Sequence, residues 1–150
     1  MFFKKSTKKL PLLLKENIRT NCKRMQKNDV IRAVGQILVD SGYVKPDYVD
    51  AMIEREKTFA TNIGNGIALP HGVEEAKKEI KASGIAVMIF PEGTDWDGED
   101  VKLVIGIAGT GDDHLAILSN IAIKMSTPEA VDQLVESSVD EIYDTLKGVE

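Results

Sequence analysis

Apolar residues recur at helical spacing in the first third of the chain. The apolar positions between residues 31 and 38 lie on one helical face, Asn28 can cap that helix, and Gly42 follows as a stop signal. Pro46 suits the first turn of a second helix, which has apolar positions between residues 49 and 53. The pattern therefore predicts two helices before the first strand.

The middle of the chain contains apolar runs that are typical of buried strands. Residues 84–90 and 101–108 are almost continuously apolar, and residues 66–69 form a shorter run of the same kind. We interpret residues 91–100 as a Gly- and Asp-rich turn between the two longer strands, and residues 73–81 as an exposed helix.

The last third of the chain predicts three more helices. Asp112 or Asp113 can cap the first, Thr127-Pro128 opens the second, and residues 138–141 have the spacing of a capping box for the third. Buried strands interleaved with helices indicate an α/β fold. We expect a single layered domain with a mixed β-sheet flanked by helices on both faces.

Composition narrows the class of protein further. With 150 residues, of which 43% are apolar and 29% charged, the chain fits one globular domain, which we place at residues 14–150 after a basic N-terminal tail at residues 1–13. The net charge of -5 and the short apolar runs predict no nucleic acid partner and no direct membrane insertion. A lone cysteine, Cys22, is consistent with a reducing compartment and a cytoplasmic location.

The candidate chemistry concentrates at a histidine on a tight turn, within the sequence Ile67-Ala68-Leu69-Pro70-His71-Gly72. Gly72 leaves the backbone beside the ring uncrowded, and Pro70 stiffens the approach. Such a turn presents an imidazole that is able to react. A histidine near a strand end can also do no more than hydrogen-bond a neighbouring carbonyl, so both interpretations stand at this point.

The second histidine, His114, also follows a predicted strand, at the position where α/β sheets place their sites. If strands 66–69 and 101–108 are parallel neighbours, both rings reach the same cleft. Two alternatives remain open. His114 fits an ordinary helix start, and Arg55, which follows the apolar face of the second helix, fits a solvated surface charge.

A collinear set of motifs connects these residues. The set comprises Gly42-Tyr43-Val44, Pro46, Tyr48-Val49, Ala51-Met52, Arg55-Glu56, Thr61, Gly64, Ile67 to Gly72, Ser83-Gly84, Pro91-Glu92-Gly93, Leu103 to Ala108 and His114-Leu115. By these motifs and their spacing, the chain resembles the mannitol-type IIA component of the bacterial phosphoenolpyruvate-dependent sugar phosphotransferase system. The resemblance extends from about Leu14 onward.

The resemblance implies a phosphotransferase component that carries a phosphohistidine. His71 would accept a phosphoryl group from the phosphocarrier HPr and pass it to the IIB domain of a membrane IIBC permease, for which the resemblance favours mannitol. His114 and Arg55 would assist the transfer. The scheme requires no cofactor and no metal.

These residue types suit phosphoryl transfer. A neutral imidazole, with an ordinary pKa of about 6.5, can attack phosphorus without a separate base. Arg55 offers a planar donor fork to the phosphoryl oxygens, and His114 and backbone N–H groups near Gly72 can add hydrogen bonds. The resemblance gives Glu56 and Thr61 supporting roles, such as orienting Arg55 or a ring nitrogen.

Two other functions are considered. A regulatory IIA-like protein would act through phosphorylation-dependent protein binding, although the segments 42–44 and 91–93 favour the transport role. A metal-dependent hydrolase would use both histidines with Asp112 and Glu74. The histidines lie too far apart in sequence for a compact ligand motif such as H-E-x-x-H.

Overall fold

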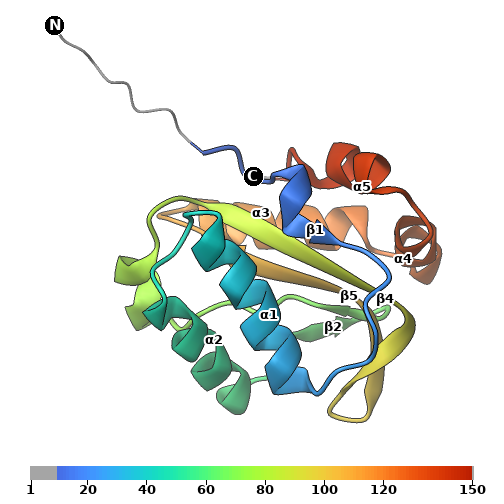
Figure 1. Cartoon of the computed structure of the whole chain (residues 1–150), viewed down its shortest axis with the longest axis horizontal. Helices are drawn as coiled ribbons and strands as arrows, with labels where there is room; N and C mark the ends of the chain where they lie inside the picture. Colours follow the sequence, from blue (N-terminus) through green and yellow to red (C-terminus); the bar gives the residue numbers. More distant parts are fainter. Residues whose placement is uncertain (1–9, 150) are drawn as a thin grey trace, which may run out of the picture.

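A five-stranded mixed sheet organises residues 10–149, which are the residues that the computed structural model describes (Figure 1). The strands are β1 (Ile18–Arg19), β2 (Asn62–Gly64), β3 (Ile67–Ala68), β4 (Gly84–Trp96) and β5 (Glu99–Ala108), in the spatial order β1-β4-β5-β3-β2. The helices are η1 (Lys15–Asn17), α1 (Lys27–Asp40), α2 (Asp47–Thr58), η2 (Glu74–Glu79), α3 (Asp113–Lys124), α4 (Pro128–Val135) and α5 (Val139–Leu146).

The strand directions bring the ends of β3 and β5 together. β4 and β5 pair antiparallel, whereas β1 pairs with β4, and β3 with β5, in parallel. The parallel β3–β5 pair confirms the expected neighbours. Ile67 pairs with Leu103, and an isolated parallel bridge between His71 and Ile107 continues the same register beyond β3. The backbone of His71 is therefore anchored to the central strand.

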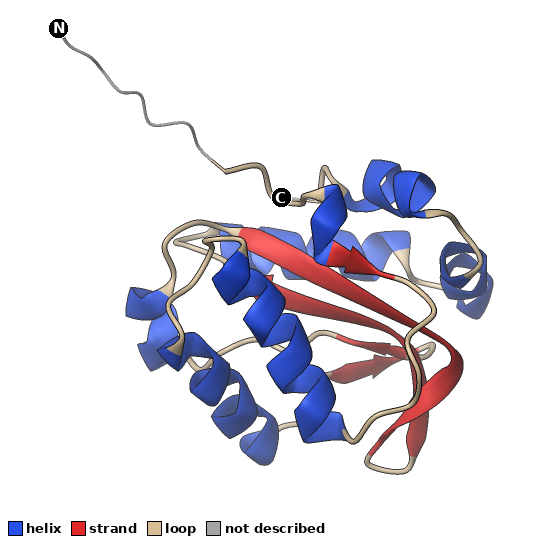
Figure 2. Ribbon diagram, in the orientation of Figure 1, coloured by secondary structure: helices blue, strands red, loops and turns tan. Residues whose placement is uncertain are grey.

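Helices cover both faces of the sheet, which confirms the predicted layering (Figure 2). On one face, alternate strand residues such as Val87 and Ile105 pack against α3, α4 and α5. On the other, residues such as Met88 and Val104 pack against α1 and α2. Because successive side chains of a strand point to opposite faces, covering both faces requires continuously apolar strands, and the sequence of β4 and β5 meets that requirement.

The predicted long turn over residues 91–100 is wrong. β4 and β5 continue through most of it, and the actual turn is Asp97-Gly98, where both residues have positive φ, 57° and 93°. The Pro- and Gly-containing residues 91–93 fall instead where the register of the strand pair shifts, as in a β-bulge. Beyond that bulge, Thr94 and Trp96 are fully buried. Their burial holds the far end of the β4–β5 pair against the rest of the domain.

The packed chain begins before the predicted boundary between residues 13 and 14. Leu12 and Leu13 are buried in the core, with 3% and 1% of their surfaces exposed, and the Leu12 carbonyl accepts a hydrogen bond from the Ile85 N–H. These two residues therefore belong to the domain and not to a tail. Residues 1–9 of the predicted basic tail lie outside the described residues.

The predicted helix starts have mixed outcomes. The Thr127 cap and the capping box at residues 138–141 are confirmed. α1 begins one residue before Asn28, which therefore does not cap it, and Asp112 occupies the N-cap position of α3 without a side-chain cap bond. The helix predicted over residues 73–81 is the shorter 3-10 helix η2.

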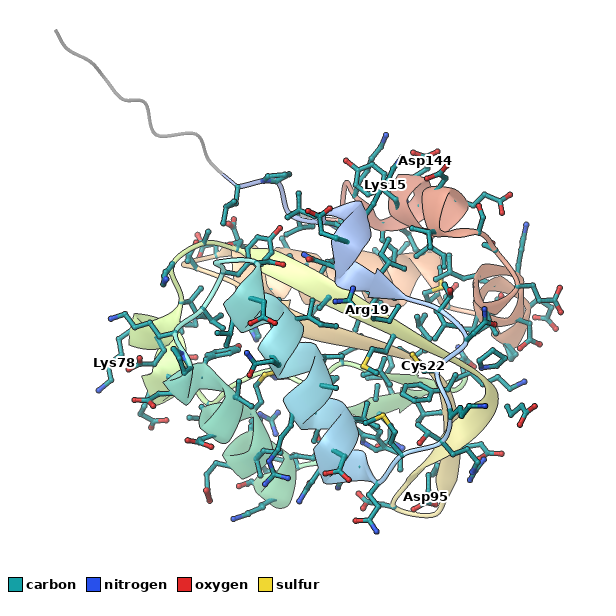
Figure 3. All side chains as sticks on the ribbon, viewed as in Figure 1. Lys15, Arg19, Cys22, Lys78, Asp95 and Asp144 are labelled. Atoms are coloured by element: carbon teal, nitrogen blue, oxygen red, sulfur yellow. The ribbon has the colours of Figure 1, made fainter. Side chains whose placement is uncertain are left out.

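Cys22 lies on the connection that runs from β1 to α1 along the edge of β4 (Figure 3). Its backbone N–H donates to the Ile89 carbonyl, and burial raises the pKa of its thiol. A raised thiol pKa disfavours the thiolate, so the microenvironment does not activate Cys22 as a nucleophile.

Candidate functional site

His71 is held at the end of the sheet with one ring nitrogen engaged. Its Nδ1 lies 2.7 Å from the Leu69 carbonyl oxygen. A carbonyl only accepts hydrogen bonds, so Nδ1 carries the proton and Nε2 keeps its lone pair. Burial lowers the pKa of His71, the Leu69 bond opposes that shift, and the charge of Arg55 adds to it. The ring is therefore neutral near pH 7, with Nε2 unprotonated.

His114 lies in the first turn of α3, beside His71. The centroids of the two rings are 4.9 Å apart, with their planes inclined at 60°. Burial lowers the pKa of His114, and the neighbouring His71 contributes to the shift. Gly109 allows the backbone of His114 to lie close to the end of β5, because a Cβ at position 109 would lie 2.6 Å from the His114 Cα. The structure thus brings the two rings side by side, as the parallel strand ends predicted, but they line different cavities: His71 lines one with Arg55, and His114 lines a smaller one with Glu74.

Arg55 adds a positive charge to the same site. Its Nη1 donates to the Phe59 carbonyl, and its guanidinium lies 5.3 Å from the centre of the Phe59 ring. Arg55 and His71 line a cavity of about 400 Å³ between the end of α2 and α3. A guanidinium beside two neutral imidazoles suits the charge and hydrogen-bonding needs of an anionic oxygen cluster such as a phosphoryl group.

Glu56 and Thr61 support the site differently from the prediction. Glu56 is buried, with Oε2 accepting from the Thr61 N–H and the Trp96 indole N–H, both at 2.9 Å, and Oε1 accepting from the Thr61 hydroxyl at 2.7 Å. The carboxylate therefore orients neither the arginine nor a ring nitrogen, which corrects that expectation. It fixes Thr61, whose carbonyl accepts from the N–H of Leu69, the residue that holds the His71 ring.

Gly72 also differs from the prediction. Its N–H donates to the Tyr48 hydroxyl at 2.9 Å, so it is not free to bind a phosphoryl oxygen. The glycine is needed because a Cβ at this position would lie 2.6 Å from the Tyr48 ring. Gly72 therefore accommodates Tyr48 instead of leaving open space. The sequence placed Tyr48 in a motif, but nothing in the local pattern indicated this contact.

A second set of contacts holds the loop in front of His114. The Ser83 hydroxyl accepts from the Thr110 N–H at 3.0 Å and donates to Asp113 Oδ2 at 2.7 Å. Asp113 immediately precedes His114, so Ser83 fastens the start of α3 to the start of β4. Sequence analysis missed this role because it joins residues that are 27 and 30 positions apart.

Apolar side chains, most of them exposed, lie beside Arg55, His71 and His114. We call this set the apolar rim; it consists of Phe59, Ile63, Leu115, Leu118 and Ala122. Phe59 and Leu115 expose 66% and 69% of their surfaces. Ile63, Leu118 and Ala122 line the cavity with Arg55 and His71. Apolar side chains grouped on a surface in this way are typical of protein-binding sites.

The site is not arranged as a metal centre. Within residues 10–149, no three His, Cys, Asp or Glu side chains are grouped so that they could hold a metal ion. The two histidines, Asp112 and Glu74 therefore supply no ligand cluster for the hydrolase alternative.

The sequence model of the family described as "Phosphoenolpyruvate-dependent sugar phosphotransferase system, EIIA 2" matches residues 11–149, and the chain belongs to this family. The family predicted from the motifs is thereby confirmed, and the protein is a phosphotransferase-system component.

Named relatives agree with this assignment. The chain is 48% identical over 124 residues to a mannitol-specific phosphotransferase enzyme IIA component of Halalkalibacterium halodurans, covering 83% of this chain and 86% of the relative. The corresponding component of Bacillus subtilis is 46% identical over 133 residues, covering 88% and 93%. The structure matches Escherichia coli enzyme IIA-mannitol, solved in complex with phosphorylated enzyme IIB-mannitol, with a TM-score of 0.81 and 36% identity over 89% of this chain and 95% of that one.

Proposed function

We propose that this protein is the IIA component of a mannitol phosphotransferase system, and that Nε2 of His71 carries the phosphoryl group. The observation that carries the proposal is the hydrogen bond from Nδ1 to the Leu69 carbonyl, which leaves Nε2 unprotonated beside His114 and Arg55. The identity to mannitol-specific components, 46% and 48%, supports the choice of mannitol.

The transfer balances without a separate base. The Nε2 lone pair of His71 forms a bond to phosphorus as the bond from phosphorus to the histidine of phospho-HPr breaks, and the electron pair of the broken bond returns to HPr. Because Nε2 holds no proton, none has to leave. In the second step, a nucleophile of the IIB domain would form a bond to phosphorus as the bond between phosphorus and Nε2 of His71 breaks, and the electron pair of the broken bond returns to Nε2.

Arg55 and His114 would stabilise the group in transit. Negative charge spreads over the equatorial phosphoryl oxygens during transfer, and positioned donors stabilise that charge. The Arg55 fork would pair with two of these oxygens once it leaves the Phe59 carbonyl. His114, with its ring centroid 4.9 Å from that of His71, would donate one more hydrogen bond.

The apolar rim would receive both protein partners. HPr as donor and a IIB domain as acceptor must each bring a side chain to Nε2 of His71, and three residues of the rim line the cavity that His71 also lines. The relative from Escherichia coli was solved with its phosphorylated IIB partner, which supports a IIB domain as one occupant.

Within residues 10–149 no helix has the length and apolarity needed to cross a bilayer. We place the protein in the cytoplasm, where it would serve a separate membrane permease.

Intact-mass measurement tests the proposal directly. The protein is incubated with phosphoenolpyruvate, Enzyme I and the HPr of the same organism, beside His71→Gln and His114→Gln variants. We expect one phosphoryl group on the native protein, none on His71→Gln, and slower but complete modification of His114→Gln. Modification of His71→Gln to the native extent would refute the assignment of the carrier residue.

A second step separates transport from the regulatory alternative. The phosphorylated protein is mixed with the IIB domain of the mannitol permease and then with permease and mannitol. Loss of the phosphoryl group to IIB and formation of mannitol phosphate support the transport function. A phosphoprotein that no sugar-specific IIB domain depletes would favour the regulatory function.

A further inference from the structure

Both peptide groups that flank His71 are tied to a single residue of the central strand. On one side, the Pro70 carbonyl accepts a hydrogen bond from the Ile107 N–H at 2.9 Å. On the other side, the Gly72 N–H donates to the Tyr48 hydroxyl, which itself donates to the Ile107 carbonyl at 2.8 Å. The first link is direct, and the second passes through one phenolic oxygen.

We infer that Tyr48 is a positioning residue for His71, and that its hydroxyl fixes the orientation in which Nδ1 meets the Leu69 carbonyl and Nε2 faces the phosphoryl donor. This inference deepens the proposed function and rests on it for the transfer step. Tyr48 does not touch the transferred group. It acts through the backbone of Gly72.

The surroundings of Tyr48 suit this role. The side chain is 2% exposed and projects from the first turn of α2. Burial raises the pKa of Tyr48 to about 12, so the hydroxyl keeps its proton and continues to donate throughout the physiological pH range. Its ring also fills the space that a side chain at position 72 would need, since a Cβ there would lie 2.6 Å from Tyr48 Cε1. The ring and the hydroxyl therefore both constrain the turn.

Removing the hydroxyl should release one side of the turn only. In Tyr48→Phe, the Gly72 N–H and the Ile107 carbonyl both lose the hydroxyl that joins them while the ring packing remains. The Pro70 link persists, so the turn can pivot about it. A pivot that rotates the His71 ring weakens the Nδ1 bond to Leu69 and allows the other tautomer, in which Nε2 carries the proton and cannot attack phosphorus.

Tyr48→Phe is compared with a matched control, Tyr43→Phe. Tyr43 is also fully buried, and its hydroxyl donates to the Pro11 carbonyl in another part of the fold. For transfer from phospho-HPr we expect kcat to fall by between about tenfold and a hundredfold in Tyr48→Phe, because misplacement of a reacting group costs rates of that order. KM should stay within about twofold, since the apolar rim is unchanged. The control should keep both values.

Nitrogen-15 spectra of the His71 ring provide a readout that needs no partner protein. We expect the native protein and Tyr43→Phe to show the Nδ1–H tautomer, and Tyr48→Phe to show a mixture with the Nε2–H tautomer. Gly72→Ala, which displaces the Tyr48 ring, should show the same mixture and keeps the test open if Tyr48→Phe does not fold.

An unchanged kcat together with an unchanged His71 tautomer in Tyr48→Phe would overturn the inference, whether or not the variant melts at a lower temperature. If Tyr48→Phe does not fold, an unchanged tautomer in Gly72→Ala would overturn it. Failure of the native protein to be phosphorylated on His71 would refute the proposed function instead, and the tautomer comparison would still decide the role of Tyr48.

Discussion

The buried carboxylate of Glu56 provides the sharpest test of how the site is supported. In Glu56→Ala, the Thr61 N–H and the Trp96 indole N–H lose their only acceptor in a region where Trp96 is fully buried and Thr61 is 5% exposed. In Glu56→Gln, an amide oxygen at the Oε2 position retains both of these bonds. Its NH₂ group can donate to the Thr61 hydroxyl in place of the bond that Oε1 accepts.

The expected loss of stability follows from these bonds. A buried donor left without an acceptor costs about 1–3 kcal/mol, so the two N–H groups make Glu56→Ala destabilising by about 2–6 kcal/mol. Small domains are stable by about 5–15 kcal/mol, so this is a large fraction of the total. Glu56→Gln loses the charge assistance of these bonds and the 3.8 Å ion pair between Oε2 and Lys27 Nζ, together about 1–2 kcal/mol. Lys27 loses its pair with Glu56 in both variants but keeps its closer ion pair with Asp97 at 2.8 Å.

Urea denaturation followed by tryptophan fluorescence measures these differences. Trp96 is the only tryptophan of the chain, and it contacts the altered group directly, so its emission reports unfolding at this position. Circular dichroism on the same samples shows whether the rest of the domain unfolds in the same transition. Glu54→Gln is the control, because Glu54 is exposed and forms only a surface pair with Lys57 at 3.7 Å. Its effect should remain within about 0.5 kcal/mol.

Two results would refute this reasoning about Glu56. A loss below about 1 kcal/mol in Glu56→Ala would mean that the two N–H groups find other partners or water at little cost. Equal losses in the Gln and Ala variants would mean that charge, and not hydrogen bonding, determines the contribution of Glu56.

Three further predictions concern the histidines and their loop. Burial lowers the pKa of His71 and of His114, so the unfolded chain binds more protons than the folded chain below about pH 6.5. The free energy of unfolding from urea titrations should therefore fall as pH drops through that region, and less so in a variant with both histidines changed to Gln. Gly109→Ala should destabilise by about 1–3 kcal/mol in thermal melts, because its Cβ meets the His114 backbone. Ser83→Ala, which releases Asp113, should slow phosphoryl transfer by about threefold to tenfold, as measured by mass spectrometry of reactions quenched at fixed times. Ser83→Thr should restore most of the rate. An additional loss from Ser83→Ala in the His114→Gln background would show that Ser83 does not act through His114.

The sequence predicted the meeting of the two histidines because strand direction decides it. Once residues 66–69 and 101–108 are taken as parallel neighbours, their carboxyl ends lie at the same edge, and the loops after them carry both rings there. The strand pair after residue 90 was predicted wrongly because Pro91 and Gly93 are common in turns. Here Gly93, with a φ of 80°, lies in a bulge, and the strands resume beyond it.

The supporting contacts could not be predicted because they join residues that are distant in the chain. Tyr48 meets Ile107, and Glu56 meets Trp96, across 59 and 40 positions. Neither pair leaves a periodic pattern or a motif in the local sequence. Both interactions depend on how α2 packs against the sheet, so they became visible only when the fold had placed that helix.

The single free nitrogen of His71 has a kinetic consequence. Nδ1 is occupied by the Leu69 carbonyl, so Nε2 is the one entrance and the one exit for the phosphoryl group under the proposed function. Donor and acceptor must therefore visit the protein in turn, and neither can bind productively while the other is present. Steady-state rates should follow a ping-pong law, and excess unphosphorylated HPr should compete with the IIB domain for access to Nε2. The rate of transfer to the sugar permease should therefore depend on the ratio of phosphorylated to unphosphorylated HPr.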